Sequence, residues 1–158
     1  MGKAKWLALV FLAMLLGCQT ARIPFPKASP PADASADAAA KQFAPATGKA
    51  NLYIARNQES FYNGEPFMVA VDGKLVGYLA PGMFFLVPVD PGPHQVSVSA
   101  LAGFDKVEGS AKADKDYFYT ISKSSSDQGK LSIGIVLFDA MGKMAVRQAN
   151  LAQGAFGP

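Results

Sequence analysis

Three turn signals at nearly regular spacing divide residues 66–100 into strand-length pieces. They are Asp72-Gly73, Pro81-Gly82 and Pro91-Gly92, and the stretches between them are rich in Val, Phe, Leu and Tyr. Such residues favour β-strands. Asp-Gly suits a two-residue hairpin because both residues tolerate positive φ, and Pro91-Gly92 suits a type II turn. The spacing therefore predicts a four-stranded meander with strands at residues 67–71, 75–79, 83–89 and 94–100.

Further strand material flanks this region, at residues 51–56, 117–122 and 131–138. Residues 83–87 are apolar at every position, which predicts burial on both faces of that strand. Pro88 cannot donate to a ladder, so we expect it at a strand end, a bulge or an edge. The pattern predicts a mainly β fold, a small antiparallel β-sandwich or open barrel.

A C-terminal helix is predicted after Phe138, where the period of the pattern changes. Asp139 can cap a helix that runs to about residue 152. Its expected apolar stripe, which we expect to cover a sheet face or edge, contains Met141, Met144, Ala145, Gln148 and Leu151 or Ala152. Gly142 weakens this pattern, and residues 153–158 are expected to form a frayed tail.

The first 18 residues have the layout of an export signal. Lys3 and Lys5 precede an unbroken apolar stretch at 6–16, and Gly17 and Cys18 follow. That stretch is too short to span a bilayer core of about 30 Å. Cys18 is the only cysteine, so no intrachain disulfide can form.

The ending Leu15-Leu16-Gly17-Cys18 resembles the lipobox of bacterial lipoproteins. The resemblance implies that residues 1–17 are removed as a signal peptide, that the Cys18 thiol receives a diacylglyceryl group and that its new amino group is acylated. Gln19 stands where an Asp would favour retention in the inner membrane. The resemblance thus implies an outer-membrane anchor facing the periplasm, or a cell-membrane anchor if the organism has no outer membrane. The alternative is an ordinary secretory signal with a chance cysteine.

Residues 18–48 are rich in Ala and Pro and show almost no apolar periodicity. Such a segment buries little surface, so we expect a flexible tether between the lipid anchor and a β-rich domain at residues 49–152. A tether of this length reaches about 30 Å. The alternative is a docking segment that uses Ile23, Phe25 and Phe43.

The charge balance gives little indication of a partner. The net charge of the whole chain is +3, from 15 Lys and Arg against 12 Asp and Glu. Removal of Lys3 and Lys5 with the signal leaves 13 basic against 12 acidic side chains, or +1. No basic run interleaved with aromatics occurs, so a nucleic-acid partner is not expected.

The string VDGKLVGYLAPGMFFLVPVDPGPHQVSVSA, followed by DKDYFYTIS, is similar to a family of bacterial envelope lipoproteins known only as a domain of unknown function. The DG and PG-H turns also resemble those of PEGA-type β-modules of surface proteins. The resemblance covers residues 49–150 and implies an envelope location and a β-rich fold. It brings no catalytic residues.

Candidate catalytic groups are few. His94 is the only histidine, and a base or metal ligand paired with Asp90 is its functional interpretation, against a structural role at a turn. Four aspartates are candidate acids or calcium ligands but lack EF-hand spacing: Asp72, Asp105, Asp114 and Asp116. The serines at 124–126 lack a G-x-S-x-G context. No metal or cofactor is expected.

A binding surface is the remaining possibility. Tyr117, Phe118 and Tyr119 alternate across a strand, so one face could present aromatic rings to a ligand. Tyr117, Tyr119 and the Asp72-Gly73 hairpin are the candidate surface. We expect a non-enzymatic binding or structural module whose partner is another envelope protein or a cell-wall glycan. The alternative is a small hydrolase acting on envelope material through His94.

Overall fold

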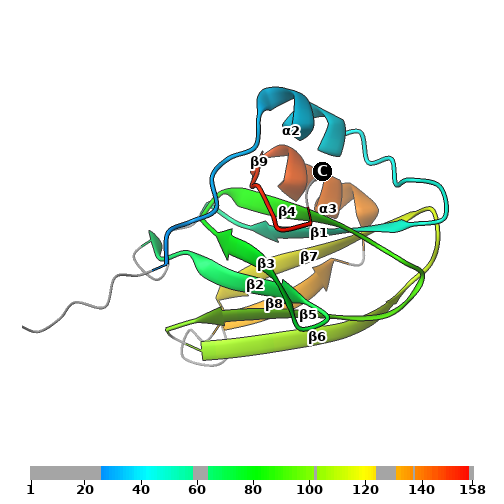
Figure 1. The fold of residues 1–158 in the computed structure, drawn as a ribbon. Helices are drawn as coiled ribbons and strands as arrows, with labels where there is room; N and C mark the ends of the chain where they lie inside the picture. The colour runs from blue at the N-terminus through cyan, green and yellow to red at the C-terminus, as the bar shows by residue number, and fades with distance from the viewer. Residues whose placement is uncertain (1–25, 59–63, 102, 124–130, 137, 157–158) are drawn as a thin grey trace, which may run out of the picture.

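The computed structural model describes residues 26–58, 64–101, 103–123, 131–136 and 138–156. It is a β-sandwich of two sheets with two helices on one outer face (Figure 1). A five-stranded sheet has the order β8-β7-β1-β4-β9, and a four-stranded sheet has the order β3-β2-β5-β6. The predicted mainly β sandwich is confirmed. The elements are α2 (Ala34–Ala40), β1 (Ala50–Arg56), β2 (Phe67–Val71), β3 (Lys74–Leu79), β4 (Met83–Val89), β5 (Gly92–Ala100), β6 (Gly103–Ala111), β7 (Lys115–Lys123), β8 (Leu131–Val136), α3 (Asp139–Arg147) and β9 (Asn150–Leu151).

The Asp-Gly hairpin forms as predicted between β2 and β3. Asp72 has φ 51° and Gly73 has φ 74°, so both central residues occupy the left-handed region that a type I′ turn needs. The two strands pair antiparallel from Phe67 opposite Leu79 to Val71 opposite Lys74.

The predicted meander is wrong, although its four strands lie where they were expected. β4 leaves the β2–β3 hairpin and pairs with β1 in the other sheet, and β5 returns to pair with β2. The side chains of β4 explain this, because Phe85 faces the core between the sheets while Phe84 packs on the opposite face, beneath the helices. Among the residues that the structure describes, only the five-stranded sheet is covered on both faces. Turn chemistry fixes where a strand ends, but not which sheet the next strand joins.

The burial expected for residues 83–87 is confirmed at Phe84, Phe85 and Val87, while Met83 and Leu86 are partly buried. Pro88 is exposed and lies beyond the two residues at which β4 pairs with β9. β1 lies between β4 and β7 and is buried at every position. It pairs antiparallel with β4 but parallel with β7, so this sheet is mixed.

Residues 29–48 do not form the flexible tether that we expected. Ser29 donates its N–H to the carbonyl of Tyr78, and Ala32 donates to that of Leu151, at 2.8 Å each. The side chain of Asp33 caps α2, and Ala40 at the end of the helix is buried. The alanines that suggested a spacer allow α2 to lie close against the domain, which therefore begins well before residue 49.

The C-terminal residues also bond to the segment at residues 29–48 and to β3. Gln153 donates to Pro30 and Ala155 donates to Val76, so the predicted frayed tail is bonded to the domain at least to residue 155. The bonds of Ser29 and Ala155 occupy edge carbonyls of β3, and the bond of Ala32 occupies one of β9, so that these groups are not open to other chains.

α3 is shorter than predicted and packs with a different face. It ends at Arg147, and Met141 and Met144 point to solvent, while Gly142 and Val146 are buried. Phe138, not Asp139, is the cap residue. The stripe was misassigned because a glycine carries no hydrophobic signal, yet its missing side chain is what admits the ring of Phe118.

Candidate binding site

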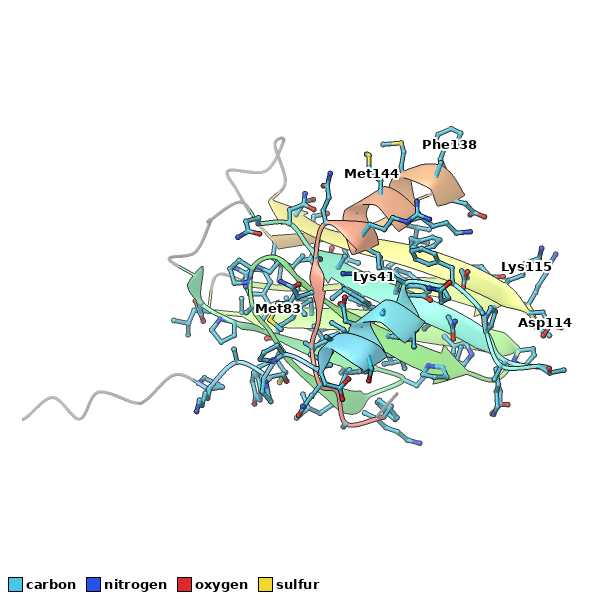
Figure 2. All side chains as sticks on the ribbon, turned by 90° about the horizontal axis from the view of Figure 1, so that it is seen from above. Lys41, Met83, Asp114, Lys115, Phe138 and Met144 are labelled. Atoms are coloured by element: carbon cyan, nitrogen blue, oxygen red, sulfur yellow. The ribbon has the colours of Figure 1, made fainter. Side chains whose placement is uncertain are left out.

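A hollow of about 530 Å³ lies where α3 begins. It is bounded by residues 43–45, the start of β7 and the end of β8. Figure 2 shows Asp114 and Lys115 at the side of the molecule where Phe138 starts α3. The lining residues are Phe43, Pro45, Lys112, Asp114, Lys115, Asp116, Tyr117, Phe118, Ile135, Val136, Asp139 and Lys143.

An aromatic cluster forms the floor of the hollow. The ring of Phe118 stacks on Tyr53, with centroids 5.2 Å apart, and meets Phe43 edge-on at 6.0 Å. Phe43 is reached by two cations of α3: Lys143 Nζ lies 5.2 Å and the Arg147 guanidinium 5.3 Å from its ring centre. Such contacts hold the floor in one arrangement and place positive charge above it.

Charged groups of both signs form the rim. Burial raises the pKa of Asp116 and Asp139 adds to this, while a hydrogen bond from Asn51 Nδ2 at 3.2 Å and the charge of Lys143 oppose it. Asp114 has φ 59°; its Oδ1 accepts from the N–H of Gly48 at 3.0 Å. Asp114 and Asp116 are therefore held in place at the rim, because the start of β7 is tied to residues 48–51.

The predicted aromatic surface is only partly found here. Tyr117 lines the hollow, and its hydroxyl accepts the N–H of Lys112 at 2.9 Å. Tyr119 is 4% exposed in the core between the sheets, so it cannot meet a ligand at the surface. Asp72 and Gly73 lie in the β2–β3 hairpin, outside this hollow. Strand alternation was read correctly, but both faces of β7 turn out to be covered.

His94 and two of the predicted acids come together at a second, smaller hollow of about 190 Å³. His94 Nδ1 lies 2.7 Å from Asp72 Oδ2, and Nε2 lies 2.7 Å from the carbonyl oxygen of Asp90. Asp72 also accepts the N–H of Gln95, and the Asp90 carboxylate pairs with Lys49 at 2.7 Å. The cluster thus ties the hairpin of β2 and β3 to the turn that precedes β5.

The surroundings of His94 favour its charged form. Burial alone lowers the pKa of His94, but the hydrogen bonds to Asp72 and Asp90 and their charges outweigh it, so that the pKa is raised. The pKa of Asp72 is lowered, since burial is outweighed by bonds from Gln95 and His94. Both ring nitrogens face acceptors and donate to them when the ring is protonated. Neither nitrogen is then available as a base or a metal ligand.

The other predicted candidates are dispersed. Asp105 accepts the N–H of Ile133 at 2.7 Å, which links β6 to β8. Across the described part of the chain, no group of three His, Cys, Asp or Glu side chains could hold a metal ion. Cys18 and the serines at 124–126 lie outside the described residues.

Sequence reasoning missed Phe43, Asp139 and Lys143 as site residues. Phe43 was considered only as part of a docking segment, and it does dock, although onto its own domain. An aromatic residue isolated in an Ala- and Pro-rich stretch was the available signal. Nothing local linked Asp139 and Lys143 to β7, because the contact of α3 with that strand is tertiary.

Comparison with protein-family models, with curated proteins and with solved structures finds no match. In the ranges that the structure describes, no helix is both long and apolar enough to cross a bilayer.

Proposed function

We propose that this protein is a lipid-anchored envelope module that binds a partner and has no catalytic role. Its anchor is an acylated Cys18 in the outer membrane facing the periplasm, or in the cell membrane if the organism has no outer membrane. The sequence Leu15-Leu16-Gly17-Cys18 and the short apolar stretch before it support this location.

The hollow beside α3 is the observation that carries the binding proposal. It combines an apolar floor with charges of both signs, and convergent polar groups around an apolar hollow are typical of a binding site. Phe118 is 2% exposed, so the partly exposed Phe43 is the floor ring that a sugar can meet. The rim lysines and aspartates suit the charged groups of wall peptides or of another envelope protein. The proposed partner is thus a cell-wall glycan with its peptides, or an envelope protein.

The hydrogen bonding of His94 favours this role over hydrolysis. A general base needs a free nitrogen and an adjacent nucleophile. The imidazole instead joins two turns through Asp72 and Asp90.

The anchor is tested by Cys18→Ser. We expect the variant to keep its signal peptide and to lose the acyl mass shift seen for the wild-type protein in intact-mass spectra. Normal maturation and continued fractionation with membranes would contradict the anchor.

The binding site is tested by photocrosslinking in intact cells from Lys115, on the exposed rim of the hollow. Glu108, exposed on the other sheet, is the matched control. We expect an adduct from position 115 that disappears when Ile135→Asp places a charge on the apolar wall. Sedimentation of the protein with purified sacculi distinguishes a glycan from a protein partner. Equal capture from both positions, unaffected by Ile135→Asp, would contradict a site at the hollow.

A further inference from the structure

Exposed apolar side chains gather where the N-terminal chain leaves the described fold. Pro26, the first described residue, lines a surface hollow together with Met68, Tyr78 and Leu101. Met68 is 40%, Leu101 76% and Phe104 63% exposed. We call Met68, Leu101 and Phe104 the exit-end patch.

The sheet register places these residues on one surface. Ser99 of β5 is the cross-strand partner of Met68 on β2 and of Phe104 on β6, so the three side chains form a row on the same face of the four-stranded sheet. Leu101 directly follows β5, at the turn that leads into β6. The patch is therefore the corner of the sandwich nearest to Pro26.

The remaining chain is too short to hold this corner far from an anchor at Cys18. The domain is fixed from Ser29 onward by bonds with Tyr78. Only eight residue steps separate Cys18 from Pro26. Fully extended, they reach about 28 Å at roughly 3.5 Å per residue. The acylated cysteine therefore keeps the corner with Pro26 within about 28 Å of the lipid surface, whereas the far side of the domain can lie further away.

We propose that the exit-end patch inserts into the bilayer beside the lipid anchor. This inference rests on the proposed acylation of Cys18. Its occupant is the lipid surface itself, because the short chain segment leads there. Charges beside the patch are mixed, with Glu65 bonded to the N–H of Leu101 and Asp105 and Lys106 next to Phe104, so insertion does not depend on anionic lipids.

Insertion at this corner orients the whole module. Figures 1 and 2 both place the start of the described chain on one side of the molecule, and Figure 2 places Phe138, Asp114 and Lys115 on the other. The candidate binding hollow then opens away from the bilayer, toward the cell wall.

Tryptophan fluorescence provides the test. Trp6 is the only tryptophan and lies in the segment expected to be removed, so the mature chain has no background signal. Leu101→Trp and Phe104→Trp report on the patch. Phe138→Trp is the matched control, since Phe138 is 70% exposed at the opposite side. Each full chain, acylated and purified from membranes, is reconstituted into phosphatidylcholine vesicles with brominated acyl chains.

We expect the emission of both patch variants to shift to the blue and to be quenched at least twofold more strongly than that of Phe138→Trp. A protein that floats with the vesicles while both patch variants remain unquenched overturns the insertion and leaves the anchor intact. Stronger quenching of Phe138→Trp also overturns it. A protein that does not float at all refutes the proposed anchor, and with it the inference that depends on it.

Discussion

Gly142→Ala should destabilise the protein although alanine is the better helix former. A Cβ at this position would lie 2.2 Å from Cγ and 2.6 Å from Cβ of Phe118. Carbon atoms pack at about 3.5 Å, so α3 would have to move from β7 by about 1.3 Å. The ring cannot yield easily, because its root atoms make the contact and Tyr53 and Phe43 pack against it.

The net effect follows from two opposed terms. Overpacking a core contact costs about 1–3 kcal/mol. The higher helix propensity of alanine offsets about 1 kcal/mol of that cost. Since the overlap involves atoms at the root of the Phe118 side chain, we expect the upper end of the range. The expected net loss is about 2 kcal/mol in the free energy of unfolding, or a melting temperature lower by roughly 6–10 °C.

Urea unfolding followed by circular dichroism measures this change, with Ala145→Gly as the propensity control on the same helix. Ala145→Gly should lose about 1 kcal/mol through propensity alone. Combining Gly142→Ala with Phe118→Ala should cost less than the sum of the two single changes, because alanine lacks the Cγ and Cδ2 atoms that make the closest part of the overlap. A Gly142→Ala protein as stable as the wild type, or more stable, would refute the close packing of α3 on β7.

Two further predictions concern the tertiary ties of the domain. His94→Gln should lower the free energy of unfolding at about pH 5.5 and have little effect on it at about pH 9. The pKa of His94 is raised in the folded state, so its protonation stabilises the fold fully below the ordinary histidine pKa of 6.5, and this stabilisation is lost as the pH rises through the folded-state pKa. Asp37→Ala should cost about 1–3 kcal/mol and speed proteolysis within residues 29–48. It removes the acceptor of the Leu151 N–H at 2.8 Å and the partner of Lys41.

Each of these has its own check. Urea unfolding across the pH range compares wild type with His94→Gln, and a stability difference that grows toward alkaline pH would contradict the charged imidazole. Asp37→Asn keeps an acceptor oxygen for Leu151, so it should resist proteolysis better than Asp37→Ala. Equal cleavage of both variants and wild type would mean that Asp37 does not hold this segment.

The strand positions and the Asp72-Gly73 turn could be predicted because their causes are local. Alternating or continuous apolar residues mark a strand, and positive φ at two adjacent residues selects Asp and Gly. The burial of β4 on both faces was likewise readable from its unbroken apolar run.

The candidate site could not be predicted in the same way. Phe43 and Lys143 meet across 100 residues of sequence, and only docking of residues 29–48 and α3 on the same sheet face brings them together. Gly142 shows most clearly why the sequence pattern could not predict this packing, since its role is to leave room for the ring of Phe118. Patterns of side-chain polarity carry no record of such a contact.

The sequence by itself determined most of the strands, the mainly β class and the residues that motivate a lipid anchor, because propensity, turn geometry and a short apolar segment act within a few residues. Only the tertiary structure decided which sheet β4 joins, that residues 29–48 belong to the domain, and that both nitrogens of His94 are engaged. Those outcomes depend on which surfaces remain to be covered once the sheets have formed. That is a property of the packed whole, and no local stretch of the chain encodes it.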